Sequence, residues 1–464
     1  MPVAPDLLQK TIQTLQDIVE QERISTAPAD LEQHARDQSA FPASLPDVVI
    51  WPRSTQEVSA ILRYANNAGL PVTAWGAGSS IEGKPIPLKG GIVLDFQQMN
   101  KIIKIHQYDF QVTVQPGVLY KDMNRELAKH GLFFAPDPGA NASIGGMIAN
   151  NAAGIRTVKY GATKDNVLAM EVVLADGRVV RTGSRSVKQS SGYDLTRLFV
   201  GSEGTLGIVT EATLKLAPLP EHFSAVVVAF PTVKEAAATV FDIIGAGLEP
   251  AALELLNATC ARLVNTEEGI NLVVAPNLLM EFHGASETAL QERLTLAKEI
   301  CREHFGQDFQ AGIGREARAQ LWRARHSLFE IALRSYPGQS FLLSDVAVPI
   351  SQYPLLISYA AELMAGLGDK GLILGHAGDG NLHTVIFFPP DDKDAEAQAH
   401  SINALLVKKA LSLSGTSTGE HGVGIGKQKY MALEHGENGL NLMRQIKAAL
   451  DPQDILNPGK VLNS

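Results

Sequence analysis

The chain has 464 residues, which is enough for two or three domains with large hydrophobic cores. Its net charge of −9 argues against a nucleic-acid partner, because such proteins usually carry a basic excess. The two cysteines, Cys260 and Cys301, belong to no C-x-x-C motif, which excludes a disulfide framework, a thiolate zinc site and an iron–sulfur cluster.

The N-terminal third predicts an α/β pattern. Residues 1–21 have the spacing of an amphipathic helix, not of a signal peptide, and the chain has no apolar run of 18 residues that could span a membrane. Strands are predicted at 47–52, 71–75 and 91–96, with a helix over 54–69 between the first two. We expect a cytoplasmic protein, with peripheral association with a membrane as the alternative.

Two prolines mark a predicted domain boundary in the middle of the chain. A hairpin is predicted around Asp176-Gly177, and a long strand follows within 204–221. Pro218 and Pro220 end this region, and helices and strands then mix through the next segment. We therefore predict three parts, with the boundaries 1–219, 220–415 and 416–464.

The stretch GAGSSIEGKP at 76–85 matches two nucleotide-binding patterns by spacing alone. A triphosphate loop needs Ser or Thr after Lys84 to bind Mg²⁺, but Pro85 stands there. A dinucleotide fingerprint needs a third glycine where Ile81 stands. What remains is a loop of glycine and serine after a strand, which is either an anion-binding nest or an ordinary tight turn.

Two more glycine-rich stretches, at 137–161 and 201–211, favour a large flat ligand, because small residues let the backbone approach closely. Together, GAGSS, PGANASIGGMIANNAAG and SEGTLGIVTE resemble the FAD-binding domain of the vanillyl-alcohol oxidase type of flavoproteins, in the branch of FAD-linked 2-hydroxy-acid dehydrogenases. The resemblance implies an α+β fold, in which a two-subdomain FAD-binding domain (1–219) is followed by an α+β cap domain with an antiparallel sheet (220–415) and a C-terminal segment (416–464) that returns to the first domain.

The resemblance also implies which residues contact FAD. The first loop has no histidine, so we expect the cofactor to be bound non-covalently. The expected contacts are Gly76, Ala77, Gly78, Ser79, Ser80, Pro138, Gly139, Ser143, Gly145, Gly146, Asn150, Gly154, Tyr160, Gly161, Glu203, Gly204, Ile208, Val209 and Asn457.

Two further motifs carry candidate chemistry. In residues 372–388, a turn at Asp379-Gly380 would place His376 opposite His383, where two imidazoles can chelate one divalent ion. The alternative is a pair of histidines satisfied within the core. The loop at 417–427 adds Glu420, a third ligand, and His421, a base; on its own it could equally be a polar turn.

In the same hydroxy-acid dehydrogenase branch these motifs supply a divalent metal site and the catalytic base. Carried over, His376, His383 and Glu420 are ligands of zinc or manganese and His421 is the base. A W-x-x-R element, Trp322 to Arg325, implies that Arg325 holds the substrate carboxylate, although an exposed helical arginine is the plain alternative.

The segment SFLLSDVAVP at 340–349 resembles the D-lactate dehydrogenases of the cytochrome type. Phe329 and Leu343 stand where the D-2-hydroxyglutarate branch carries polar residues, which favours a small or apolar substrate tail. We expect D-lactate first, glycolate second and D-2-hydroxyglutarate third, with a cytochrome, quinone or electron-transfer protein as acceptor. A homodimer and a flavin-binding subunit of a larger complex both remain open. Lys84, where lactate enzymes often carry histidine, receives no role.

Overall fold

The computed structural model describes residues 5–267 and 270–462, and the chain divides there into two units. Unit 1 contains the residues up to Ala153, then Gly161–Leu219, and from Glu420 onward. Unit 2 contains Gly154–Tyr160 and Pro220–Gly419. The chain thus leaves unit 1 after Leu219 and returns at Glu420, while a short piece at 154–160 belongs to unit 2.

Within the described residues, unit 1 contains a four-stranded sheet, a five-stranded sheet and a two-stranded sheet formed by β7 and β11, together with eight α-helices. Its strands are β1 (Ile24–Ser25), β2 (Val48–Ile50), β3 (Val72–Trp75), β4 (Ile92–Asp95), β5 (Ile102–His106), β6 (Gln111–Val114), β7 (Leu132–Phe133), β8 (Val167–Val173), β9 (Val179–Gly183), β10 (Ile208–Lys215) and β11 (Ala217–Pro218). Its helices are α1 (Pro5–Gln16), α2 (Pro28–Gln33), α3 (Thr55–Ala68), α4 (Tyr120–Ala128), α5 (Ile144–Asn150), α7 (Thr163–Asn166), α8 (Leu195–Phe199) and α15 (Met431–Leu450).

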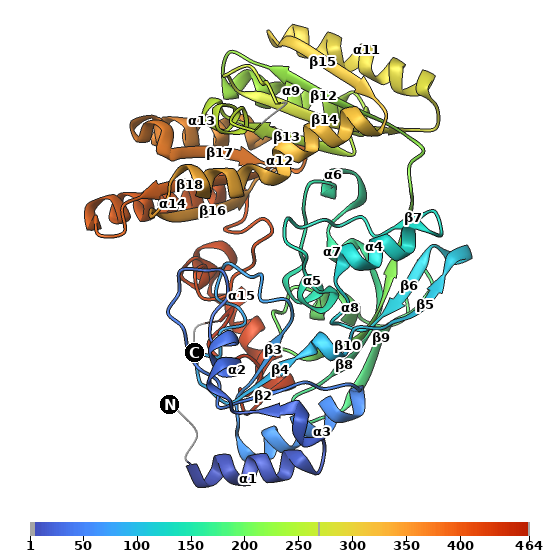
Figure 1. Cartoon of the computed structure of the whole chain (residues 1–464), viewed down its shortest axis with the longest axis vertical. Helices are drawn as coiled ribbons and strands as arrows, with labels where there is room; N and C mark the ends of the chain where they lie inside the picture. Colours follow the sequence, from blue (N-terminus) through green and yellow to red (C-terminus); the bar gives the residue numbers. More distant parts are fainter. Residues whose placement is uncertain (1–4, 268–269, 463–464) are drawn as a thin grey trace. The chain divides into compact units, whose positions relative to one another are not determined.

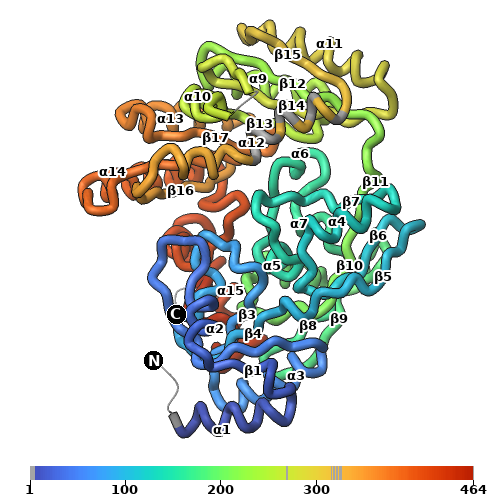
Figure 2. The backbone as a smooth tube through the Cα atoms, in the orientation of Figure 1, coloured from blue at the N-terminus to red at the C-terminus, as the bar shows by residue number. Residues whose placement is uncertain are grey.

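The first sheet has the strand order β1-β2-β4-β3, in which β2, β4 and β3 run parallel. The sequence determines both ends of the neighbouring helix α3. The Ser54 side chain accepts a hydrogen bond from Glu57 N at its start, and Gly69 ends it at φ +64°. The end of the chain completes this sheet: Val72 N donates to Ile455 O, and Asn457 N donates to Val72 O. Figure 2 shows this C-terminal part, in red, running back among the blue N-terminal strands of the same unit.

The second sheet is antiparallel with the order β5-β6-β10-β8-β9. The hairpin predicted at Asp176-Gly177 is confirmed, since Val173 pairs with Val179 and Gly177 adopts φ +83°. A buried apolar cluster between this sheet and helices α4 and α5 forms its core, including Val112, Met123 and Ile148. The start of α5 is therefore held firmly beside the sheet.

Unit 2 is built on one seven-stranded sheet (Figure 1). Its strands are β12 (His222–Ala229), β13 (Ala252–Leu256), β14 (Asn277–Gly284), β15 (Gln307–Ile313), β16 (Ser340–Ala347), β17 (Gly371–Gly375) and β18 (Asn381–Phe388). Its helices are α6 (Thr157–Tyr160), α9 (Val233–Gly245), α10 (Ala258–Val264), α11 (Glu287–Glu303), α12 (Arg315–Ser335), α13 (Tyr353–Met364) and α14 (Lys393–Ser412).

The strand order of that sheet is β15-β12-β14-β13-β17-β18-β16, and every neighbouring pair is antiparallel. The antiparallel cap sheet predicted for this region is thus confirmed. Helices α10 and α12 pack on one face through a cluster that includes Leu256, Leu328 and Val385. Because side chains alternate along a strand, Glu254 and His383 point to the same face as Leu256 and Val385.

Among the helices within the described ranges, none has both the length and the apolar character that a membrane crossing requires.

Candidate active site

The three glycine-rich stretches meet within unit 1. A Cβ added to Gly76 would lie 2.3 Å from Ser143 Oγ, so the loop after β3 presses on the start of α5. At the other end of α5, Gly201 N donates to Ile148 O at 2.9 Å and Glu203 N donates to Ala149 O at 2.8 Å. Stretches far apart in the sequence are therefore side by side, as a shared cofactor site requires.

The glycines of these stretches serve two different purposes. Gly76 and Gly145 let the chain pack closely on neighbouring residues, since a Cβ on Gly145 would lie 2.7 Å from Pro116 Cβ and 3.1 Å from Pro116 O. Gly139 instead has no atom within 4 Å of an added Cβ, and for Gly204 the nearest is Ala74 Cβ at 3.9 Å. Open space beside backbone at these two glycines fits a flat ligand lying against it.

Several of the residues expected to contact FAD also form hydrogen bonds or pack in the core within the protein. Asn457 Nδ2 donates to the carbonyls of Lys84 and Glu203, at 3.1 and 2.8 Å. The buried Ile208 side chain belongs to the core of the first sheet, and the hydroxyl of Tyr160, in unit 2, lies 2.7 Å from His283 Nδ1. Their roles toward FAD stay predictions. The other predicted contacts lie in unit 1 except Gly154, which falls in unit 2: Ala77, Gly78, Ser79, Ser80, Pro138, Gly146, Asn150, Gly161 and Val209.

In unit 2, His376 and His383 come together, but not in the predicted register. Leu374, and not His376, pairs with His383, because the three-residue 3₁₀ turn η6 (Ala377–Asp379) and Gly380 at φ +78° make a longer connection than the two-residue turn predicted. His376 is a diagonal neighbour of His383 on the same face. The ring centroids are 5.2 Å apart, and one nitrogen of each ring lies within 4.8 Å of the other.

A buried glutamate behind this pair orients one ring. Glu254, on β13, is fully buried; its Oε1 lies 2.7 Å from His376 Nδ1 and its Oε2 accepts from Arg325 Nε at 2.7 Å. Burial alone would raise the pKa of Glu254, but the charges and hydrogen bonds of His376 and Arg325 hold it below its ordinary value. An ionised Glu254 keeps the proton on His376 Nδ1, so that Nε2 carries the lone pair that a metal ligand needs.

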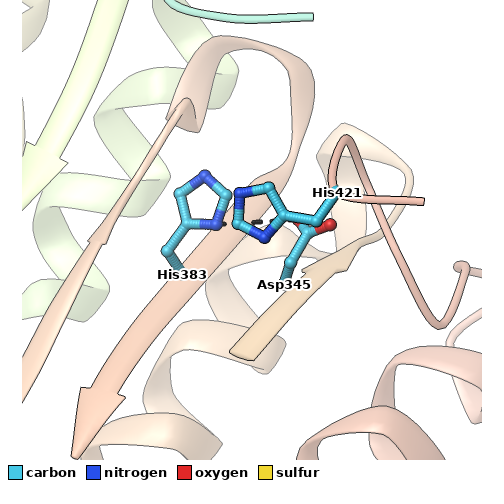
Figure 3. Close-up of side chains that lie close together, drawn as sticks. All are labelled: Asp345, His383 and His421. Atoms are coloured by element: carbon cyan, nitrogen blue, oxygen red, sulfur yellow. Dashed lines mark ion pairs between the residues drawn. The ribbon is translucent and has the colours of Figure 1, made fainter. Parts of the chain in front are cut away.

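A second carboxylate lies beside His383. Asp345, fully buried on β16, is directly opposite His383 in the sheet, with 3.6 Å between Oδ1 and His383 Nδ1 (Figure 3). It also accepts from Asn381 Nδ2 at 2.8 Å and from Thr418 Oγ1 at 2.7 Å. Two buried imidazoles, each next to a carboxylate, have the donor chemistry of a zinc or manganese site.

Sequence reasoning missed both carboxylates. Each is a lone acidic residue in an apolar strand, Glu254 in ALELL and Asp345 in FLLSDVAV. Acidic side chains are rarely fully buried unless they are paired, and that rule was the available signal.

The predicted substrate arginine is already engaged through one nitrogen. Arg325 projects from α12 to Glu254 through Nε and is largely buried, which excludes the plain alternative of an exposed helical arginine. A guanidinium has five N–H donors in a fixed fork, so the terminal nitrogens remain for a carboxylate. Trp322 is buried against Ile155 and Ala252 and supports the helix.

Glu420 and His421 are the first two residues of the C-terminal segment of unit 1, and they follow directly after Gly419, the last residue of unit 2. A Cβ on Gly419 would lie 2.2 Å from Asn381 Nδ2 and 3.0 Å from Asp345 Oδ1, so Gly419 packs tightly on the carboxylate cluster. A trans peptide separates successive Cα atoms by about 3.8 Å. Glu420 follows Gly419 directly in the chain, and its role as a metal ligand stays a prediction.

The orienting role of Glu254 gives a direct prediction for metal affinity. Glu254→Gln keeps the shape of the side chain but removes the charge that fixes His376, so binding of Zn²⁺ or Mn²⁺ is expected to weaken by about 10-fold to 100-fold. Metal retained after dialysis against a graded chelator measures this. The matched control is Asp242→Asn, which breaks the carboxylate–imidazole pair with His304 elsewhere in unit 2. Equal metal retention in both variants would contradict the role.

Comparison with known proteins identifies the family to which the chain belongs. Residues 219–461 match the family model described as "FAD linked oxidases, C-terminal domain", and residues 46–183 match "FAD binding domain". The chain belongs to the FAD-linked oxidases. It is an FAD-dependent enzyme, as the glycine-rich stretches predicted.

Relatives of this FAD-linked oxidase cover nearly its whole length. It is 41% identical to "D-lactate dehydrogenase [cytochrome], mitochondrial" of Arabidopsis thaliana, over 92% of this chain and 76% of the relative. It is 39% identical to "Glycolate oxidase subunit GlcD" of Bacillus subtilis, over 90% and 89%. The solved 4-ethylphenol oxidase from Gulosibacter chungangensis shares the fold, with a TM-score of 0.80, 19% identity and coverage of 99% and 98%.

Proposed function

We propose that this FAD-linked oxidase oxidises a D-2-hydroxy acid to the 2-keto acid, with D-lactate and pyruvate as the favoured pair. One observation carries the proposal: the buried, carboxylate-backed pair of His376 and His383, with Glu420 and His421 next along the chain after Gly419. The names of relatives that are 39 to 41% identical support the same substrate class.

His376, His383 and Glu420 would hold a divalent metal, zinc or manganese, as a two-histidine, one-carboxylate set. When bound, that ion supplies a Lewis acid that makes the 2-hydroxyl of the substrate more acidic. Glu254 would act through its hydrogen bond to His376, which orients that ring, and Asp345 would act through its negative charge, 3.6 Å from His383 Nδ1.

The remaining residues orient the substrate and move one proton. The terminal nitrogens of Arg325 bind the substrate carboxylate, while its Nε stays on Glu254. His421 takes the proton of the 2-hydroxyl on a ring nitrogen. FAD, when bound, supplies the acceptor for the C2 hydrogen with its electron pair. Loss of that proton and that hydride leaves the keto acid.

Apolar residues on this face of the sheet and on α12 support a small substrate. Leu343 lies on β16 two residues before Asp345 and so on the same face, and Phe329 contacts Phe341, with ring centroids 5.4 Å apart. A methyl tail suits such surroundings better than a second carboxylate, which would need a cationic partner. This favours D-lactate over D-2-hydroxyglutarate.

Glycolate oxidation is the second candidate, and the relative named as a glycolate oxidase subunit favours it. Under that alternative the chain would work as one subunit of a larger complex. For the D-lactate activity we propose a cytochrome as electron acceptor, as the name of the Arabidopsis relative suggests. A quinone and an electron-transfer protein are the other candidates.

A substrate panel tests the proposal. The purified chain, loaded with FAD and metal, is assayed with D-lactate, L-lactate, glycolate and D-2-hydroxyglutarate and an artificial acceptor. The highest kcat/KM is expected for D-lactate. A higher kcat/KM for glycolate would favour the second candidate, and no turnover of any acid by the loaded chain would contradict both as activities of the chain alone.

A further inference from the structure

We propose that Lys84 is a positioning residue that holds the backbone of His421 in place. The inference rests on the proposed function, in which His421 is the base. Lys84 Nζ donates a hydrogen bond to the carbonyl oxygen of His421 at 2.6 Å and a second one to Asn150 Oδ1. Lys84 belongs to the loop after β3, so a residue 337 positions earlier in the chain binds the backbone carbonyl of the proposed base.

The neighbours of His421 are held in the same way. Asn150 Nδ2 donates to Glu420 O at 2.7 Å. Beyond His421, Glu203 accepts from Val423 N at 2.6 Å and from Gly424 N at 2.9 Å. Carbonyls and N–H groups along 420–424 are thus bound to side chains from three separate stretches of unit 1. A segment bound at so many points has little freedom to shift its side chains.

Gly422 shows how closely these groups surround the segment. Its φ is +76°, and an added Cβ would lie 2.5 Å from Asn150 Oδ1, 2.7 Å from Glu203 Oε1 and 3.0 Å from Lys84 Nζ. The ammonium, the amide and the carboxylate therefore converge on one point directly after His421. The sequence requires glycine there on both steric and conformational grounds.

Lys84 is itself fixed at both ends. Its carbonyl accepts from Asn457 Nδ2, which also donates to the carbonyl of Glu203. Burial raises the pKa of Glu203. The positive charge of Lys84 opposes this rise more than any other neighbouring group does. Lys84 thus combines a neutralising charge with a directed hydrogen bond, and a test must separate these two roles.

The test compares three forms of the FAD-loaded chain. Lys84→Met removes the ammonium at similar length. A misplaced catalytic group costs about 100-fold for 1 Å, so we expect the limiting rate of flavin reduction by D-lactate to fall about 10-fold to 100-fold. The FAD content and the Kd for D-lactate should change far less. Lys89→Met, at an exposed lysine of the same loop, is the matched control and should behave as wild type.

A chemical rescue supplies the conservative variant. Alkylation of Lys84→Cys with 2-bromoethylamine rebuilds an ammonium on a side chain of nearly lysine length. The native thiols should resist the reagent, because both are buried and burial raises the pKa of Cys260 and of Cys301 to about 12. Recovery of the limiting rate is expected. A normal rate in Lys84→Met, or a loss that goes with FAD release and is not recovered on alkylation, would overturn the proposal.

Hydrogen exchange of the amides in 420–425 provides a readout that needs no substrate. Lys84→Met should raise the exchange rate of these amides, and Lys89→Met should not. If D-lactate fails to reduce even the wild-type flavin, the proposed function is wrong, and the exchange result then decides separately whether Lys84 holds the segment. Unchanged exchange in Lys84→Met would reject the positioning role in either case.

Discussion

Replacing His421 by asparagine is expected to slow flavin reduction by D-lactate about 100-fold to 10,000-fold, the range typical for a lost general base. Asparagine keeps the polarity and the backbone contacts of the segment, including the carbonyl that Lys84 binds. The Kd for D-lactate should therefore change little. Anaerobic stopped-flow absorbance over a range of D-lactate concentrations separates the limiting rate from binding.

The matched control for that variant is His435→Asn, which replaces a partly exposed histidine on α15 in the same unit. It should reduce its flavin at the wild-type rate. A limiting rate of His421→Asn within a few-fold of wild type would show that another group takes the hydroxyl proton.

Replacing His383 by alanine is expected to remove the metal and nearly all turnover while FAD stays bound. A metal-bound substrate gains several kcal/mol of charge stabilisation in the transition state, which corresponds to a rate loss of about 1000-fold or more. FAD should remain, because most of its predicted contacts are in unit 1 and His383 is in unit 2. Metal analysis, flavin absorbance and turnover, measured on the same sample, check the three expectations.

His400→Ala, at an exposed histidine on α14 of the same unit, is the control for nonspecific effects. Chelation of the wild-type chain should reproduce the His383→Ala result, and Zn²⁺ or Mn²⁺ should restore activity to the chelated chain but not to the variant. Full activity after complete removal of metal would rule out the metal-assisted mechanism.

The broad architecture could be predicted from sequence because local rules decide it. The Ser54 cap, Gly69 at positive φ and the Asp176-Gly177 hairpin all act within a few residues, and both the helix predicted over 54–69 and the predicted hairpin are present. The antiparallel cap sheet and the FAD-linked family were predicted from the resemblance that the glycine-rich stretches carry.

The predicted pairing of His376 with His383 failed because a turn's length cannot be read from its glycine alone. Asp379-Gly380 suggested a two-residue turn, whereas η6 extends the connection and shifts the register by two residues. A shift of two keeps side chains on the same face, and so the histidines still meet. A shift of one would have separated them.

The orienting residues could not be predicted because they act across long sequence distances. Glu254 meets His376 only when β13 and β17 pair, and Lys84 meets His421 only when the chain's end returns to unit 1. Neither contact leaves a local pattern. In the sequence, Lys84 completed the spacing of a phosphate loop that Pro85 excluded, and it stood where lactate enzymes often carry histidine; its contacts with His421 and Asn150 give a reason for a lysine there.

In the proposed reaction, this chain transfers the C2 hydrogen of a D-2-hydroxy acid to its own FAD. Anaerobic mixing of the FAD- and metal-loaded chain with one equivalent of D-lactate tests it most directly. We predict bleaching of the flavin with an equimolar yield of pyruvate, and no bleaching with L-lactate. A flavin that stays oxidised with D-lactate, glycolate and D-2-hydroxyglutarate alike would contradict the proposed oxidation of a D-2-hydroxy acid.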